Sequence, residues 1–195
     1  MQHSIAEALV RRVVWLSVAC AVACGGSGKS PSVSKDDLSF SATSSKAVYA
    51  AGEPIVITLQ VANNSSSTLS LSEGLDGTVS LDATRDGVAV KARDMAINFD
   101  DDLAVLLSQS LQSVAPRASV ELTWQSFDDA DQGGQVLRAV EYRADGPHRS
   151  HRSLVGAPGD YSLRLRYGYP AALAKAASAY AGELGPAEVS FQVTP

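Results

Sequence analysis

Two histidines, His148 and His151, are the residues in the body of this sequence best suited to metal binding or proton transfer. They lie within residues 145–158, a stretch so rich in Gly, Pro and Ser that it predicts a loop and not a helix. In a loop, two imidazoles three residues apart could reach the same metal ion, with Asp145 or Asp160 as a third ligand. The two histidines are therefore the candidate metal ligands of this sequence.

The residues around the histidines favour a simpler interpretation, a solvated basic loop that contains Arg149 and Arg152. A zinc peptidase would need His-Glu-x-x-His on a helix, which sets two imidazoles on one face, and the sequence has no such motif. The Gly-x-Ser-x-Gly turn that presents an acyl-transfer serine is also missing from the sequence. We therefore predict no catalytic residue, no bound metal and no cofactor, and we expect that the protein is not an enzyme.

Two acidic clusters, Asp100–Asp102 and Asp128–Asp131, carry the carboxylate oxygens that calcium prefers. The first cluster precedes a leucine-rich stretch, where negative charge stabilises the positive end of a helix dipole. The second cluster continues into Gln132-Gly133, which breaks the alternation of a calcium loop, and no glutamate ends it. We expect the first cluster to start a helix, and we expect calcium at neither cluster.

Residues 23–30, Ala-Cys-Gly-Gly-Ser-Gly-Lys-Ser, formally match a relaxed phosphate-binding loop with Ala23 in the first glycine position. Such a loop binds phosphate only between a buried strand and a helix whose N-terminal amides face the ligand. Here the stretch follows an apolar N-terminal segment and continues into Pro31-Ser32-Val33-Ser34. This composition is typical of a flexible tether, so we expect no nucleotide to bind.

The N-terminus has the pattern of an export signal. Arg11 and Arg12 precede the apolar run Val13–Ala23, which ends in small residues before Cys24. The run is shorter than the roughly 20 residues that a membrane-spanning helix needs. Its last residues resemble the lipobox of bacterial lipoproteins, although Ala21 stands where that family prefers leucine. The resemblance implies cleavage after residue 23 and lipidation of Cys24, with Cys20 as a poorer second candidate.

Cysteine usage agrees with export, and the net charge limits the classes of partner. Both cysteines of the chain, Cys20 and Cys24, lie at the signal boundary, so the folded body has no disulfide. Without residues 1–23, the remaining 14 basic and 20 acidic residues give a charge of −6, which argues against nucleic acid or an anionic membrane face as the main partner. We predict a signal peptide over residues 1–23, a tether over 24–37 and one folded domain over 38–195.

The folded part reads as many short strands divided by turn residues. Between Pro54 and Ala62, aliphatic residues alternate with more polar ones, which predicts a strand with one buried face. Tyr161–Tyr167 alternates in the same way, and Asp86-Gly87 is a strong hairpin signal. Further strands are expected at residues 38–42, 68–71, 79–84, 88–93, 95–99, 120–124, 136–143 and 187–193. This pattern predicts a mainly β fold, an antiparallel β-sandwich.

Two stretches change to helical spacing. Leucines recur at three- and four-residue steps over residues 103–112, and Asp102 is a suitable N-cap. Apolar residues follow one stripe over residues 170–184, where Pro170 suits the first turn and Gly185-Pro186 suits the end. We predict two short helices inserted at the ends of the sandwich.

Several strand-and-turn motifs together resemble a known domain type. They are Tyr49…Gly52-Glu53-Pro54-Ile55, Asn63-Asn64-Ser65, Arg85-Asp86-Gly87, Val114-Ala115-Pro116 and Pro158-Gly159-Asp160-Tyr161. Their order resembles immunoglobulin-like accessory domains of bacterial exported proteins. It is similar to the non-catalytic sandwich that precedes the zinc domain of some deuterolysin-type metallopeptidases, and to the intracellular proteinase inhibitor family. The resemblance implies an immunoglobulin-like fold and transfers no site residue.

These observations lead to one expected role and one alternative. We expect a lipoprotein held at the cell membrane by its N-terminal lipid, facing the periplasm or the outer membrane, with Gly25 typical of outward sorting. Its domain would act as a non-catalytic binding or structural module with a protein partner in the cell envelope. The alternatives are a secreted protein without lipid, and a protease inhibitor or an accessory domain of a protease system.

Overall fold

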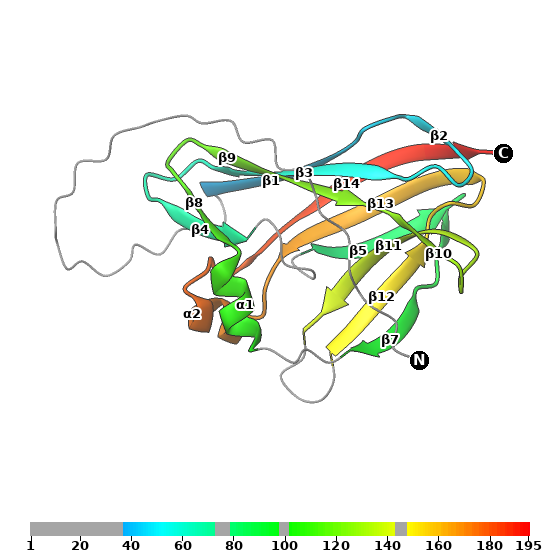
Figure 1. The fold of residues 1–195 in the computed structure, drawn as a ribbon. Coiled ribbons are helices and arrows are strands. Elements are labelled where there is room, and N and C mark those ends of the chain that lie inside the picture. Colours follow the sequence, from blue (N-terminus) through cyan, green and yellow to red (C-terminus); the bar gives the residue numbers. More distant parts are fainter. Residues whose placement is uncertain (1–36, 73–78, 98–101, 143–147) are drawn as a thin grey trace, which may run out of the picture. The chain divides into compact units, whose positions relative to one another are not determined.

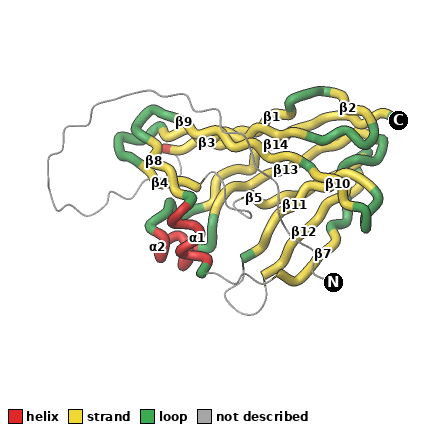
Figure 2. The backbone as a smooth tube through the Cα atoms, viewed as in Figure 1, coloured by secondary structure: helices red, strands yellow, loops and turns green. Residues whose placement is uncertain are grey.

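The computed structural model describes residues 37–72, 79–97, 102–142 and 148–195. These residues form a mainly β protein with two short helices, as the sequence predicts. Figure 1 and Figure 2 show the strands gathered into several sheets, with the helices together at one end. The predicted signal peptide, Cys20, Cys24 and nearly all of the predicted tether lie outside the described residues.

The first sheet is antiparallel and has the order β1-β3-β9. Its strands are β1 (Leu38–Ser44), β3 (Val56–Asn63) and β9 (Ser119–Gln125). The burial predicted for the central strand is confirmed, because Ile57, Leu59 and Val61 are fully buried while the residues between them are half-exposed. A period of two in the sequence therefore located the inward face of β3 correctly.

The second sheet has the order β2-β14-β13-β5-β6. Its strands are β2 (Val48–Ala50), β14 (Glu183–Thr194), β13 (Gly159–Gly168), β5 (Val79–Arg85) and β6 (Val88–Ala89). Its strands pair antiparallel, except that β2 runs parallel to β14. The predicted hairpin joins β5 to β6, and Asp86 and Gly87 both have positive φ, 53° and 77°. Two positive φ angles are what a type I′ turn requires, which explains the Asp-Gly pair.

Side chains of these two sheets form one hydrophobic core. The buried aliphatics of β3 and β13 belong to the same cluster, together with aromatic residues of β2, β13 and β14. Phe191 lies between Tyr161, stacked at 5.2 Å between ring centroids, and Tyr49, edge-on at 5.4 Å. Aromatic pairs at these separations add stability beyond the area that they bury. The core therefore draws on residues more than a hundred positions apart in the chain.

A third sheet has the order β10-β11-β12-β7. Its strands are β10 (Phe127–Asp129), β11 (Gly134–Glu141), β12 (His148–Leu154) and β7 (Arg93–Ile97). The loop predicted over residues 145–158 is wrong, because His148–Leu154 pairs with β11 on one side and with β7 on the other. Pairing on both sides satisfies the backbone of β12, which outweighs the weak strand propensity of its Ser, Arg and His residues.

The first predicted helix is present but shorter. Helix α1 (Leu103–Gln109) begins after Asp102, whose Oδ1 accepts a hydrogen bond from the backbone N–H of Ala104 at 2.8 Å, so the predicted N-cap is confirmed. The prediction of helix to residue 112 is wrong. Residues Leu111–Val114 form β8, which pairs with β4 (Leu69–Ser72). Pairing with a distant strand therefore ends the leucine-rich helix one turn early.

The second predicted helix is also shorter than residues 170–184. Helix α2 (Ala171–Ala177) ends where Ser178 takes a left-handed conformation, with φ of 59°. Beyond it the N–H of Tyr180 donates to the Ser70 carbonyl, and β14 begins at Glu183 beside β13. Gly185-Pro186, predicted to end the helix, therefore lies inside β14. Among the described residues, neither helix has the length and hydrophobicity to cross a membrane.

Candidate ligand-binding site

The two candidate histidines do not come together. His148 and His151 lie three positions apart on β12, and successive side chains of a strand point to opposite faces. His148 packs edge-on against the Tyr142 ring, whereas His151 lies beside carboxylates on the other face of the sheet. A single metal ion cannot bridge them in this arrangement. Within the described residues, no three His, Cys, Asp or Glu side chains gather in a way that could hold a metal.

His151 links three strands of the third sheet. Its Nδ1 lies 2.7 Å from Oδ1 of Asp94 on β7, and its Nε2 lies 3.3 Å from Oε2 of Glu141 on β11. Arg149 adds an ion pair to Asp94 at 3.8 Å. Both ring nitrogens thus face carboxylates, which leaves neither directed at a nucleophile or a substrate. The contacts of His151 suit a link across the sheet, and the flanking carboxylates were not foreseen from its basic neighbours in the sequence.

In the second acidic cluster, Asp129 pairs with an arginine of the third sheet. Asp129 is buried, accepts a hydrogen bond from Nη1 of Arg152 at 2.8 Å and accepts another from the backbone N–H of Asp131 at 3.0 Å. The hydrogen bond from Arg152 is the main reason that the pKa of Asp129 lies below its usual value. Asp100 and Asp101 of the first cluster lie outside the described residues, as does Asp145.

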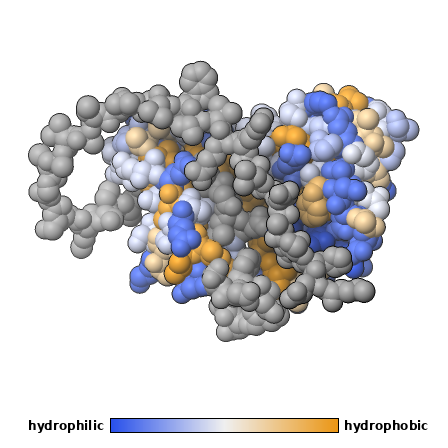
Figure 3. All heavy atoms as spheres, in the orientation of Figure 1, coloured by the Kyte–Doolittle hydropathy of each residue, from blue (hydrophilic) through white to orange (hydrophobic). Residues whose placement is uncertain are grey.

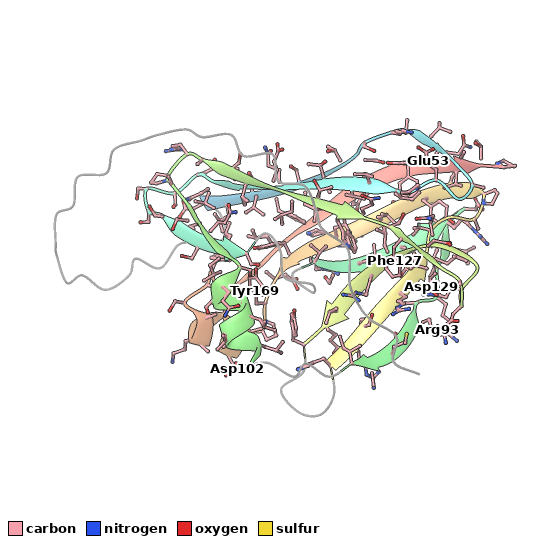
Figure 4. All side chains as sticks on the ribbon, viewed as in Figure 1. Glu53, Arg93, Asp102, Phe127, Asp129 and Tyr169 are labelled. Carbon is pink, nitrogen blue, oxygen red and sulfur yellow. The ribbon has the colours of Figure 1, made fainter. Side chains whose placement is uncertain are left out.

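An open cleft lies where the third sheet meets the second sheet and helix α2. Its volume is about 450 Å³, within the range of small-molecule sites. The ends of β11 and β13 and the segments on both sides of α2 line it. Tyr142 and Tyr169 are its aromatic residues, and Arg166, Glu141 and Glu183 are its charged ones. Figure 4 shows Tyr169 close to the two helices. The cleft combines an apolar wall with a few polar groups, the usual composition of a ligand site.

Tyr169 is held in place by a buried hydrogen-bond network. Its hydroxyl accepts a hydrogen bond from the backbone N–H of Ser72 at 3.2 Å and lies 3.1 Å from the Tyr167 hydroxyl. The Tyr167 hydroxyl in turn donates to the Ser72 carbonyl at 2.8 Å. Burial is the main reason that the pKa values of Tyr142, Tyr167 and Tyr169 lie above the usual value for tyrosine. All three phenols are therefore neutral at physiological pH.

Arg166 is the positively charged residue that lines the cleft. Its Nη1 donates to Oδ2 of Asp82 at 3.0 Å, and its Nε lies 3.8 Å from Oε1 of Glu183. A guanidinium with two carboxylate neighbours keeps a fixed orientation but has little net charge to offer. The cleft therefore has aromatic surface, fixed donors and fixed acceptors, which suits a polar, uncharged ligand with hydroxyl groups.

Sequence reasoning did not find this cleft, because its members come from distant places. Tyr142 follows β11, Arg166 lies on β13 and Glu183 begins β14. No local spacing relates these residues, and each one alone is an ordinary strand residue. The alternation of Tyr161–Tyr167 placed Arg166 on the outer face of its strand, which is the single signal that pointed toward the cleft.

No protein family matches this sequence, and no curated protein is similar to it. Among solved structures, the chain is similar to part of the Pseudomonas fluorescens alkylpurine DNA glycosylase AlkC bound to DNA containing an abasic site analog. The TM-score is 0.37 and the sequence identity is 11%, and the match covers 82% of this chain and 31% of the glycosylase chain.

Proposed function

We propose that this protein is a bacterial lipoprotein, anchored through Cys24, whose β domain is a non-catalytic binding module of the cell envelope. The observation that carries the binding role is the cleft of about 450 Å³. The Val13–Ala23 run and Cys24 support the anchor. Several acyl chains, at about 0.8 kcal/mol for each buried CH2, would hold the domain firmly on a membrane.

We also propose that the domain is an immunoglobulin-like sandwich with additions. Strand pairing supports this, because β1-β3-β9 and β5-β13-β14 occupy the chain positions of the A-B-E and C-F-G strands of that fold. The third sheet is then an addition, since β10, β11 and β12 lie between the proposed E and F strands. The cleft lies where the third sheet meets the proposed sandwich. The proposed ligand site therefore depends on the added sheet.

The alternative role, a protease inhibitor or an accessory domain of a protease system, is supported by the resemblance of the turn motifs. The cleft favours a domain that takes up a ligand. A protease inhibitor would instead insert one of its own loops into the protease. We therefore propose the binding role first.

Metabolic labelling with a clickable palmitate analogue tests the anchor. We expect label on the wild-type chain and on Cys20→Ser, because both proteins keep Cys24, the proposed lipidated residue. We expect none on Cys24→Ser, which lacks the thiol that would be acylated. Globomycin should make the unprocessed wild-type precursor accumulate. Label that persists on Cys24→Ser would contradict the anchor.

A pair of variants on one helix tests the cleft. Ala171 lines the cleft, whereas its neighbour Ala172 is equally exposed and does not. In a thermal-shift screen of neutral oligosaccharides, we expect a compound that raises the Tm of the wild-type chain. Ala171→Trp should abolish that shift by filling the cleft, and Ala172→Trp should preserve it. Shifts of equal size in both variants, or no compound that binds, would contradict a ligand site in the cleft.

A further inference from the structure

Three arginines form a row across the third sheet. Arg138 on β11 lies directly opposite Arg152 on β12, and Arg152 lies directly opposite Arg93 on β7. Directly opposed residues of an antiparallel sheet point to the same face, so the three guanidinium groups share one face. Neighbouring strands are about 4.8 Å apart, and the row therefore spans roughly 10 Å. Like charges in opposed positions destabilise a sheet, and the two aspartates beside Arg93 and Arg152 offset only part of the positive charge of the row.

The row runs from the interior of the sheet to its edge. Arg138 is half-buried, and the side chains of Arg152 and Arg93 are 22% and 48% exposed. Burial, followed by the charge of Arg152, lowers the pKa of Arg138 below its usual value. On the outer side, Nη1 of Arg93 lies 3.7 Å from Oδ2 of Asp131. The row is thus more exposed to solvent at the β7 edge than at its centre.

Arg152, at the centre of the row, is fixed but has unused donor capacity. Its Nη1 donates to Asp129, and its guanidinium carbon lies 5.7 Å from the centre of the Phe127 ring. Its Nε is buried and has no hydrogen-bond partner within the described residues. Two positions away on the same face, Ser150 is 1% exposed, and its hydroxyl likewise has no partner there. Buried polar groups are normally paired, and these two donors share one face of β12.

We propose that this face of the third sheet is a binding site for an oxyanion, a phosphate or a carboxylate group of a ligand. The Arg93 side chain holds it at the β7 edge and Arg152 at the centre of the row. Arg138 adds positive charge from within, and the Ser150 hydroxyl donates a hydrogen bond. Arginine suits this role because its planar donors match the geometry of carboxylate and phosphate oxygens.

The oxyanion site is distinct from the proposed lipid anchor and extends the proposed binding role. Arg138 precedes the cleft residue Val140 by two positions on β11, so the two residues share a face. Figure 4 shows Arg93 and Asp129 at the opposite end of the third sheet from Tyr169, and Figure 3 shows hydrophilic residues gathered over the β10 region.

Titration of the full-length chain in a mild non-ionic detergent tests the site. The probes are sodium phosphate and sodium citrate, each compared with sodium chloride at equal ionic strength, followed by calorimetry and by the Tm. We expect saturable binding of at least one probe. Arg93→Gln and Arg138→Gln should each weaken it about tenfold, since the first removes a charged hydrogen bond and the second removes a nearby positive charge. Arg164→Gln changes an exposed arginine of β13, outside the row, and should leave binding intact.

The relative affinities identify the ligand chemistry. Tighter binding of phosphate indicates a phosphoryl group, and tighter binding of citrate indicates a carboxylate group; either result supports the site. Binding no stronger than that of chloride, or equal weakening by Arg164→Gln, would overturn it. These outcomes are independent of the palmitate labelling and of the Ala171→Trp comparison, so each proposal can fail alone.

The stability of the unliganded variants gives a second readout. If the row serves a ligand, removing one charge relieves repulsion, so Arg138→Gln should keep or raise the Tm at low salt. A structural role would instead lower the Tm, and a lowered Tm together with unchanged probe affinity would overturn the proposal. Ser150→Ala should weaken probe binding without lowering the Tm, because its hydroxyl has no partner among the described residues.

Discussion

Asp129 illustrates how a buried carboxylate stays charged in this protein. The hydrogen bond from Arg152 at 2.8 Å stabilises the ionised form, and the pKa of Asp129 therefore lies below its usual value. The turn after β10 contributes as well, because the N–H of Asp131 donates to the same carboxylate. One residue thus joins the ends of β10 and β12, and it also orients the central arginine of the proposed oxyanion site.

The depressed pKa of Asp129 predicts a pH dependence of stability. A carboxyl group that is more acidic in the folded state contributes stability above its unfolded pKa of about 3.9, and that contribution is lost as the pH falls further. We expect wild type to lose more stability than Asp129→Asn between about pH 5 and pH 2. Urea unfolding at several pH values measures this. Parallel losses in both proteins would show that the Asp129–Arg152 contact contributes nothing.

Tyr169 also forms a buried hydrogen bond that joins two strands, in this case between neutral groups. Its hydroxyl is the acceptor for the buried N–H of Ser72, which connects the end of β13 to β4. Tyr169→Phe removes this acceptor, and the loss of a buried hydrogen bond costs about 0.5–1.5 kcal/mol. We expect a loss of this size in the free energy of unfolding, measured in urea.

Tyr180→Phe is the matched control for Tyr169→Phe, because Tyr180 is a half-buried tyrosine close to the same helix. Its loss of stability should be clearly smaller. Equal losses in the two variants would mean that the hydrogen bond to Ser72 is not the source of the effect.

At the scale of elements, strands with one buried face were predictable and strands without one were not. The alternation of β3 and β13 located their inward residues correctly, because one face of each lies on the core. β12 has no such alternation, since arginines and histidines occupy both of its faces. Its strand conformation depends on hydrogen bonds to β11 and β7. The polar composition of β12 gives no sign of this pairing in the sequence.

The face assignment of β3 can be tested with two neighbouring substitutions. Leu59 is fully buried, whereas Gln60 is half-exposed on the opposite face beside Glu121. Leu59→Asp would bury a charge without a partner and should unfold the domain. Gln60→Asp should cost less than about 1 kcal/mol, because its carboxylate stays in water. Circular dichroism during thermal unfolding distinguishes the two; equal effects would contradict the orientation of β3.

Helix ends were also decided by partners elsewhere in the fold. The spacing of leucines located the start of α1, and Asp102 caps it as predicted. The ends of both helices were placed too late, since β8 pairs with β4 and β14 pairs with β13. Local apolar periodicity cannot distinguish one more helical turn from a short strand that finds a partner.

At the scale of the whole molecule, the chain brings together residues that the sequence keeps apart. The core combines the first and second sheets, and the third sheet meets the second along the cleft. Both proposed sites, the cleft and the arginine row, include residues of β11. The proposed binding role therefore depends on a sheet whose strands are scattered between residues 93 and 154.

The sequence by itself determined the mainly β character, the buried faces of β3 and β13, the turn at Asp86-Gly87 and the cap at Asp102. These features depend on residues close together in the chain, where period, turn geometry and capping act directly. The tertiary structure alone decided the third sheet, the separation of His148 from His151, the cleft and the row of arginines. Those features depend on pairing between distant strands, because strand register places side chains on a common face whatever their distance along the chain.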